Sequence, residues 1–184
     1  MADSLTVVWD SEAADTKRDD ESWDEYREHA GISLAGIYVV ERGEYEFYDE
    51  QSLEELAAQL EGAGLVVSYN GVHYDHLVLD AALGRRVYMP NELDLWDVIK
   101  CAQTRSWPKG SWTLGAVCER TFGEGKKGDG AFAPHLAAKG RWGDLATYLV
   151  RDVWLTWKLW EFMRAMGYVI DPDGCKMVVG VKNG

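Results

Sequence analysis

The sequence contains little cysteine, and the spacing of its cysteines does not suit a disulfide framework or a zinc site. Cys101, Cys118 and Cys175 are an odd number and form no C-x-x-C pair. A disulfide framework needs paired cysteines and a zinc ribbon needs closely spaced pairs, so the sequence indicates neither. We expect three ordinary buried thiols.

Long apolar runs are also absent. No stretch approaches the length that spans a bilayer, and residues 1–6 contain no basic region followed by an apolar one. We therefore expect a soluble, intracellular protein with no membrane partner. The 184 residues are 47% hydrophobic, which is enough for one core, and they contain no internal repeat or low-complexity linker. We expect a single domain spanning residues 1–184.

Basic residues are the minority, with 19 Lys and Arg against 31 Asp and Glu and a net charge of -12. This balance is unfavourable for a nucleic-acid-binding protein, because such affinity comes largely from neutralising phosphates with Lys and Arg. A carboxylate-lined site that recruits divalent cations would add positive charge that the count omits. Much of the acid lies in residues 15–28, which we interpret as a solvated loop or short helix rather than a means of recruiting metal. The motif G-x-x-x-x-G-K-[S/T] is missing, which disfavours a nucleotide-binding switch protein.

Apolar and β-branched residues predict three strands at the beginning of the chain. The runs lie at residues 5–9, 32–40 and 45–48, with a turn at Arg42-Gly43. We expect these strands to pair antiparallel. A nearly continuous apolar run at 65–69 suits a strand covered on both faces after a βαβ connection. The sequence therefore predicts an α/β fold whose mixed sheet has three antiparallel strands followed by parallel strands.

Helical spacing of apolar residues accounts for most of the remaining chain. Ser52 and Glu55 have the form of a capping box, and a helix over 52–61 follows them. We expect helices to flank the sheet. The later predicted segments are helices over 74–83 and 143–166, a helix or strand-to-helix transition over 93–102, and a hairpin of 168–170 with 177–181.

Two carboxylates, Asp10 and Glu12, stand at the end of the first predicted strand. They are two residues apart, so they project from one face if the strand geometry continues. Such a pair can bind a divalent cation, although Asp10-Ser11-Glu12 is also typical of a polar surface loop. A metal site would need further ligands from elsewhere in the chain.

Two later segments contain candidate ligands. Asp75 follows the Asn70-Gly71 turn at the start of a predicted helix, where an acid is also typical as a partner of the helix dipole. Tyr148 and Asp152 are four residues apart on one face of the long helix. Tyr148 could equally be a core residue. A carboxylate among apolar helix residues, however, requires a partner or a metal if it is buried.

Taken in order, these segments resemble the motifs of the DEDD superfamily of 3′-to-5′ exonucleases, in its tyrosine-bearing (DEDDy, DnaQ-like) branch. Asp10-x-Glu12 resembles the first motif, Asn70-Gly71-x-x-Tyr74-Asp75 the second and Tyr148-x-x-x-Asp152 the third. The resemblance implies a ribonuclease H-like fold, similar to predicted exonuclease domains of bacteria and phages, and a cytoplasmic location in a bacterial or phage-infected cell. It covers residues 5–169 and extends to Asp94-Leu95, Trp112-Thr113-Leu114-Gly115 and Gly128-Asp129-Gly130.

The resemblance also implies chemistry: hydrolysis of phosphodiester bonds in DNA or RNA with two divalent ions, Mg²⁺ or Mn²⁺, roughly 4 Å apart. By similarity, Asp10 would contact both ions, Glu12 and Asp152 would hold the ion that activates water, and Asp75 would hold the second ion through water. A tyrosine hydroxyl, with a pKa of about 10, is a poor general base. Tyr148 would therefore orient the attacking water.

The implied substrate is a nucleic acid with a single-stranded 3′ end, and the implied partners are replication or repair proteins. Asn70 is a candidate for contacts to the sugar or terminal base, although it could serve only the turn. Lysines near Trp107 and Trp112 could guide and stack a single strand, although tryptophan is equally a core residue. The candidate substrate contacts are Asn70, Tyr74, Lys109, Trp112, Lys126 and Lys127.

One departure from the family and several alternatives stay open. The family usually has an apolar residue and a threonine around the first motif, whereas this chain has Ser11 and Ala13-Ala14, which puts the contact to the terminal nucleotide in doubt. The same fold could serve as a non-catalytic binding module, which the retention of all four acids disfavours. It could also belong to an endonuclease or RNA-processing enzyme, because the metal chemistry is shared. A zinc site formed by His73 and His76 with Cys101 or His135 is disfavoured by its spacing.

Overall fold

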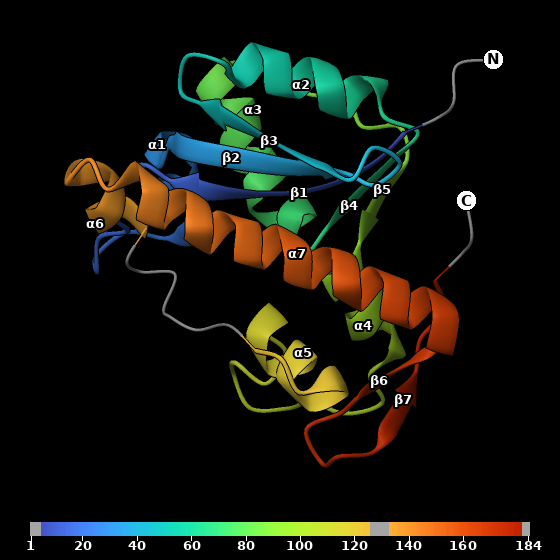
Figure 1. Cartoon of the computed structure of the whole chain (residues 1–184). Helices are drawn as coiled ribbons and strands as arrows, with labels where there is room; N and C mark the ends of the chain where they lie inside the picture. The colour runs from blue at the N-terminus through green and yellow to red at the C-terminus, as the bar shows by residue number, and fades with distance from the viewer. Residues whose placement is uncertain (1–4, 126–132, 182–184) are drawn as a thin grey trace.

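The computed structural model describes residues 5–125 and 133–181, and a five-stranded sheet lies at its centre (Figure 1). β1, β2 and β3 pair antiparallel, whereas β1 with β4 and β4 with β5 pair parallel. The predicted mixed sheet and the ribonuclease H-like class are therefore confirmed. The strand order is β3-β2-β1-β4-β5, and the bounds are β1 Thr6–Ala13, β2 Ile32–Val39, β3 Glu44–Asp49, β4 Leu65–Ser68 and β5 Glu92–Asp94.

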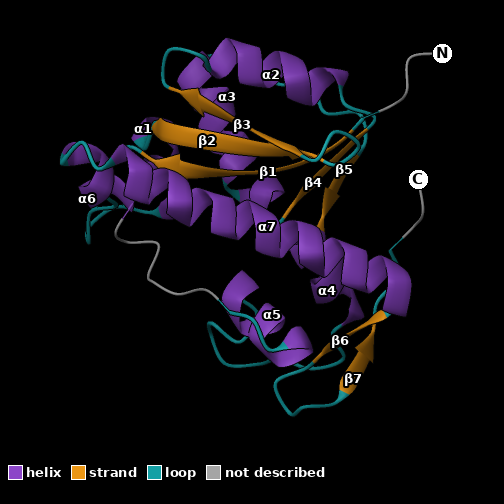
Figure 2. Ribbon diagram, in the orientation of Figure 1, coloured by secondary structure: helices purple, strands orange, loops and turns teal. Residues whose placement is uncertain are grey.

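Helices cover both faces of the sheet (Figure 2). α2 and α3 lie on one face, and the long helix α7 crosses the other (Figure 1). The predicted helices, the strand-to-helix transition at β5 and α4, and the final hairpin are confirmed. In the described part of the chain no helix is both long and apolar enough to cross a membrane. The remaining bounds are α1 Trp23–His29, α2 Leu53–Gly62, the 3-10 turn η1 Gly71–His73, α3 Asp75–Leu83, α4 Leu95–Ala102, α5 Leu114–Phe122, α6 Ala133–Ala138, α7 Trp142–Met166, β6 Tyr168–Ile170 and β7 Lys176–Val178.

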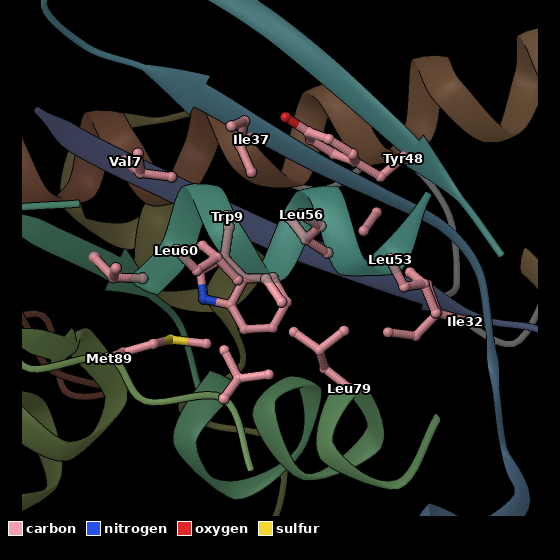
Figure 3. Packing of buried hydrophobic residues seen from close by; sticks show 14 of the residues in the cluster. Val7, Trp9, Ile32, Ile37, Tyr48, Leu53, Leu56, Leu60, Leu79 and Met89 are labelled. Atoms are coloured by element: carbon pink, nitrogen blue, oxygen red, sulfur yellow. The ribbon is translucent and has the colours of Figure 1, made fainter. Parts of the chain in front are cut away.

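β1 separates two hydrophobic cores because successive side chains of a strand point to opposite faces. Val7 and Trp9 pack with residues of α2 and α3 (Figure 3). Val8 belongs to the second core, which α7 covers. The same alternation places Asp10 and Glu12 on the face covered by α7.

α7 comes close to the sheet at Gly36 of β2. Gly36 is the partner of Asp10 in the β1–β2 ladder, and a Cβ atom added to it would lie 3.1 Å from the Leu149 side chain. Leu149 is fully buried. Because Gly36 has no side chain, Leu149 can pack directly on β2. This contact brings Asp152, three residues further along α7, toward Asp10.

Local expectations at the first motif and at the α2 capping box were wrong. β1 does not end near Asp10 but continues to Ala13, because the ladder with β2 extends through both carboxylates. Ser52 forms no capping box at α2, since its hydroxyl bonds with Asp49 instead. A capping box is found at α1, between Ser22 and Glu25.

The expectation of three buried cysteines was also wrong. Cys118 is buried, but Cys101 and Cys175 are exposed. Cys101 lies in the last turn of α4 on the side away from the buried Leu95 and Ile99, and Cys175 lies between β6 and β7.

Leu149→Ala should lower the free energy of unfolding by about 2–5 kcal/mol, because it leaves a cavity between α7 and β2. Leu77→Ala on α3 is the matched control: Leu77 is 41% exposed, and the loss should stay below about 1 kcal/mol. Urea unfolding of both variants measures the difference. Equal losses would contradict the packing of α7 on β2.

Candidate metal centre

Three of the four predicted acids meet between β1 and α7. Carboxylate oxygens of Asp10, Glu12 and Asp152 lie within 4.8 Å of one another. Glu12 is 6% exposed and Asp152 is 2% exposed, whereas Asp10 is half-buried. Burying like charges this close together is costly unless a proton or a cation compensates them. Three oxygen donors in this arrangement could hold a divalent cation of the kind that prefers oxygen ligands.

The buried face of α7 fixes the position of Asp152. Leu149, Asp152 and Val153 are three and four residues apart, so they lie on the same side of the helix, and all three are buried. Tyr148, one turn before Asp152, is half-buried and lines the same pocket as the acids. The structure therefore places Tyr148 beside the carboxylates.

Asp75 lies in the same pocket but outside the group of three. Its Oδ1 accepts hydrogen bonds from the Ser11 backbone N–H at 3.2 Å and from the Ser11 hydroxyl at 2.6 Å. Ser11, where this chain departs from the family pattern, thus joins the first motif to the second. Burial raises the pKa of Asp75 to about 6, and the hydrogen bonds from Ser11 oppose that shift.

Asp94 holds the second motif in place. In the sequence, Asp94 stood out only as part of the extended resemblance. The Asp94 carboxylate accepts hydrogen bonds from the backbone N–H groups of Asn70, at 2.8 Å, and Val72, at 3.1 Å, and also caps α4. Asn70 has a φ of 65°, a left-handed conformation that asparagine tolerates better than most residues. A Cβ atom on Gly71 would lie 2.6 Å from Ser68, so the turn requires glycine there. Asn70 therefore does serve the turn.

A pocket of about 700 Å³ is lined by the four acids, and residues of the acid-rich segment 15–28 form one of its walls. The expected short helix is α1, and most of the acids before and within it are exposed. The segment nevertheless contributes to the pocket, which the sequence reading missed because its charge pattern resembles that of a solvated face. Trp23 of α1 is 56% exposed. The wall residues are Thr16, Lys17, Trp23, Tyr26 and Arg27.

Tyr74, a predicted substrate contact, belongs to an aromatic group in this wall. Its ring centroid lies 6.2 Å from that of Trp23, edge to face, and 6.4 Å from that of Tyr26, stacked. Burial raises the pKa of Tyr74 above its ordinary value. The Tyr74 hydroxyl therefore stays protonated in neutral solution.

A second pocket, of about 480 Å³, shares Asp10 and Asn70 with the first. Two further predicted substrate contacts, the exposed Lys109 and the half-buried Trp112, line it. Lys126 and Lys127 lie outside the described residues, as does the Gly128-Asp129-Gly130 motif.

The histidines do not form the zinc site considered above. Ligand atoms of His73, Asp94 and Asp97 lie within 4.8 Å of one another, but Asp94 already accepts three backbone N–H groups. His76 contacts Glu92 at 3.0 Å and the Val87 carbonyl oxygen at 2.8 Å. We interpret both histidines as local hydrogen-bonding groups.

Asp75→Asn should change the pH dependence of stability in the metal-free protein. Because of the raised pKa, Asp75 keeps its proton up to about pH 6 in the folded state, whereas in the unfolded chain it loses the proton near pH 4. Ionisation of Asp75 therefore costs stability as the pH rises from 4 to 6, by about 2–3 kcal/mol. Asparagine keeps an acceptor for Ser11 and removes this cost.

Urea unfolding in EDTA at several pH values measures the effect. The stability of Asp75→Asn relative to the native chain should increase between pH 4 and pH 6.5. A constant difference between Asp75→Asn and the native chain over this pH range would contradict the raised pKa.

Comparison with known proteins supports the fold. The chain matches no protein-family model and no curated protein sequence. Among solved structures it is similar to a family B DNA polymerase from the hyperthermophilic archaeon Pyrobaculum calidifontis, with a TM-score of 0.64 and 14% identity. The match covers 88% of this chain but only 24% of the polymerase, so the chain corresponds to about a quarter of that protein. At this identity the similarity shows a shared fold.

Proposed function

We propose that the protein is a metal-dependent 3′-to-5′ exonuclease that hydrolyses phosphodiester bonds of DNA or RNA. The observation that carries the proposal is the meeting of Asp10, Glu12 and Asp152 within 4.8 Å in a pocket that also contains Asp75 and Tyr148. We further propose that residues 1–184 act as one domain in the cytoplasm of a bacterial or phage-infected cell, alongside replication or repair proteins.

The four acids divide into two roles in this proposal. Asp10, Glu12 and Asp152 would hold two divalent ions, Mg²⁺ or Mn²⁺, and Asp75, in its position against Ser11, would assist through water. Bound ions would supply charge neutralisation at the scissile phosphate and a water acidic enough to attack at neutral pH. The Tyr148 hydroxyl, one turn before Asp152, orients the attacking water by a hydrogen bond.

One observation favours hydrolysis over a binding role, and a second favours a nucleic acid as the substrate. A module that only binds nucleic acid gains nothing from packing three carboxylates together, because they repel phosphate unless cations are present. One protein that shares the fold is a DNA polymerase, which favours a nucleic acid as the substrate here. Asn70 and Tyr74 lie close enough to the acids, in the same pocket, to contact a terminal nucleotide.

Digestion of 5′-labelled single-stranded DNA and RNA tests the proposal. With Mg²⁺ or Mn²⁺ the native protein should shorten the labelled strand from its 3′ end and give a ladder of products. EDTA should abolish this ladder. Asp10→Asn and Asp152→Asn should lose at least about 100-fold in rate, because each removes a charged ligand. Tyr148→Phe should retain metal binding but lose about 10-fold to 100-fold through misplacement of the water.

Asp144→Asn is the matched control, since it changes an exposed acid on the same helix and should cleave at the native rate. Cleavage that persists in EDTA, or equal rates in all the Asp→Asn variants, would rule out the carboxylate site. A labelled strand that stays at full length under every metal condition, with folded protein, would favour the binding module instead. Products that start in the middle of the strand would indicate an endonuclease.

A further inference from the structure

Three tryptophans line the second pocket, which shares Asp10 and Asn70 with the acidic one. Trp96 belongs to α4, and Trp107 and Trp112 belong to the segment between α4 and α5. All three are half-buried, and the Trp107 and Trp112 rings meet edge to face at 6.2 Å. Asp10 and Asn70 belong to both pockets, so a molecule in the second pocket would lie beside the carboxylates.

A basic side chain packs over each of these rings. Lys100 Nζ lies 4.4 Å from the Trp96 ring centroid, and the Arg105 guanidinium lies 4.0 Å from the Trp107 ring. Arg120 lies 5.3 Å from the Trp112 ring. Aromatic surface next to positive charge suits a nucleotide, whose base stacks on a ring and whose phosphate attracts cations.

The segments beside the two pockets differ in net charge. Residues 100–120 contain four basic residues, Lys100, Arg105, Lys109 and Arg120, and one acid, Glu119, and Arg105 also pairs with Asp173. Residues 10–28, which include the α1 wall, contain nine acids and three basic residues. A polyanion is therefore attracted to the tryptophan side and repelled from the α1 side, even though the whole chain carries a net charge of -12.

We propose that the second pocket binds the unpaired nucleotides just upstream of the cut. A single strand enters over Trp96, Trp107 and Lys109, passes Asn70, and ends in the first pocket against α1. This inference rests on the proposed nuclease function and adds the direction of the strand. Stacking on an indole requires an exposed base face, which paired and stacked bases of a duplex do not offer, so the substrate class is single-stranded nucleic acid.

Trp107 is the better residue for testing this proposal. Trp112 is fixed through its backbone, because the Tyr69 hydroxyl donates to its carbonyl oxygen and Arg120 donates to the adjacent Ser111 carbonyl at 2.7 Å. The Trp112 side chain also packs against the second core, so replacing it would disturb the fold. Trp142 is the matched control: it is another tryptophan, 51% exposed, and it lines neither of the two pockets.

The experiment measures two quantities for the native protein, Trp107→Ala, Trp107→Phe and Trp142→Ala. The first is the affinity for a fluorescent ten-nucleotide single strand of DNA or RNA in EDTA, where no cutting occurs, with Asp10→Asn and Asp152→Asn added to each of the four proteins to reduce the repulsion of phosphate by the carboxylates. Trp107→Ala should bind roughly tenfold more weakly, Trp107→Phe should recover part of the loss, and Trp142→Ala should bind as the native protein does. A blunt duplex should bind more weakly than the single strand.

The second quantity is hydrolysis of the p-nitrophenyl ester of thymidine 5′-monophosphate with Mn²⁺, in which the p-nitrophenyl group stands in for all of the upstream nucleotides. Trp142→Ala should hydrolyse it at the native rate. Trp107→Ala should lose less on this substrate than on the ten-nucleotide strand, because most of the strand that Trp107 would contact is missing. Native affinity of Trp107→Ala for the single strand, equal binding of the duplex, or no binding of either strand by the native protein would overturn the strand path. Weakened binding by Trp107→Ala with no hydrolysis by any variant would overturn the nuclease proposal and leave the strand path supported.

Discussion

The packing of α7 across β1 and β2 is the contact on which the candidate site depends. Leu149 rests on Gly36, and Gly36 is the ladder partner of Asp10. One strand and one helix, more than a hundred residues apart in the chain, thereby bring their carboxylates within 4.8 Å. Apolar burial on α7 holds the acids together against their mutual repulsion. The same side chains that stabilise the second core therefore determine the geometry of the site.

A second constraint is the tie between the first two motifs. Ser11 donates both its backbone N–H and its hydroxyl to Asp75, and Asp94 holds the turn that precedes Asp75. Neither Ser11 nor Asp94 belongs to the group of three acids. Ser11 positions Asp75, and Asp94 positions the turn. Together they connect β1, β5 and the turn that follows β4, at the C-terminal ends of these strands. This arrangement also explains why Gly71 and the left-handed Asn70 stand where they do.

The sequence predicted the sheet and singled out the carboxylates that the fold brings together, because both leave local signals. Alternating apolar residues indicate strands, and carboxylates spaced by two along β1 or embedded in an apolar helix stand out by residue type alone. The α1 wall was missed because its acids mark a solvated surface, while the residues that reach the pocket, such as Lys17 and Trp23, have no distinctive spacing.

Other differences have a similar origin. The ladder with β2 carries β1 through Glu12 to Ala13, and strand pairing with a distant segment cannot be read from the residues themselves. Ser52 and Ser22 both precede a glutamate by three residues, yet only Ser22 forms the capping box, because Asp49 competes for the Ser52 hydroxyl. Trp107 and Trp112 stand out in the sequence beside Lys109, but the place of Trp96 in the same pocket required the fold, since nothing in the residues alone brings α4 to that pocket.

The most direct test of the account is a crystal structure of the protein soaked with Mn²⁺, with the ions located by anomalous scattering. The account predicts peaks between β1 and α7 with oxygen ligands from Asp10, Glu12 and Asp152. Peaks only at His73, Asp94 and Asp97, or no peak between β1 and α7 at saturating Mn²⁺, would contradict it.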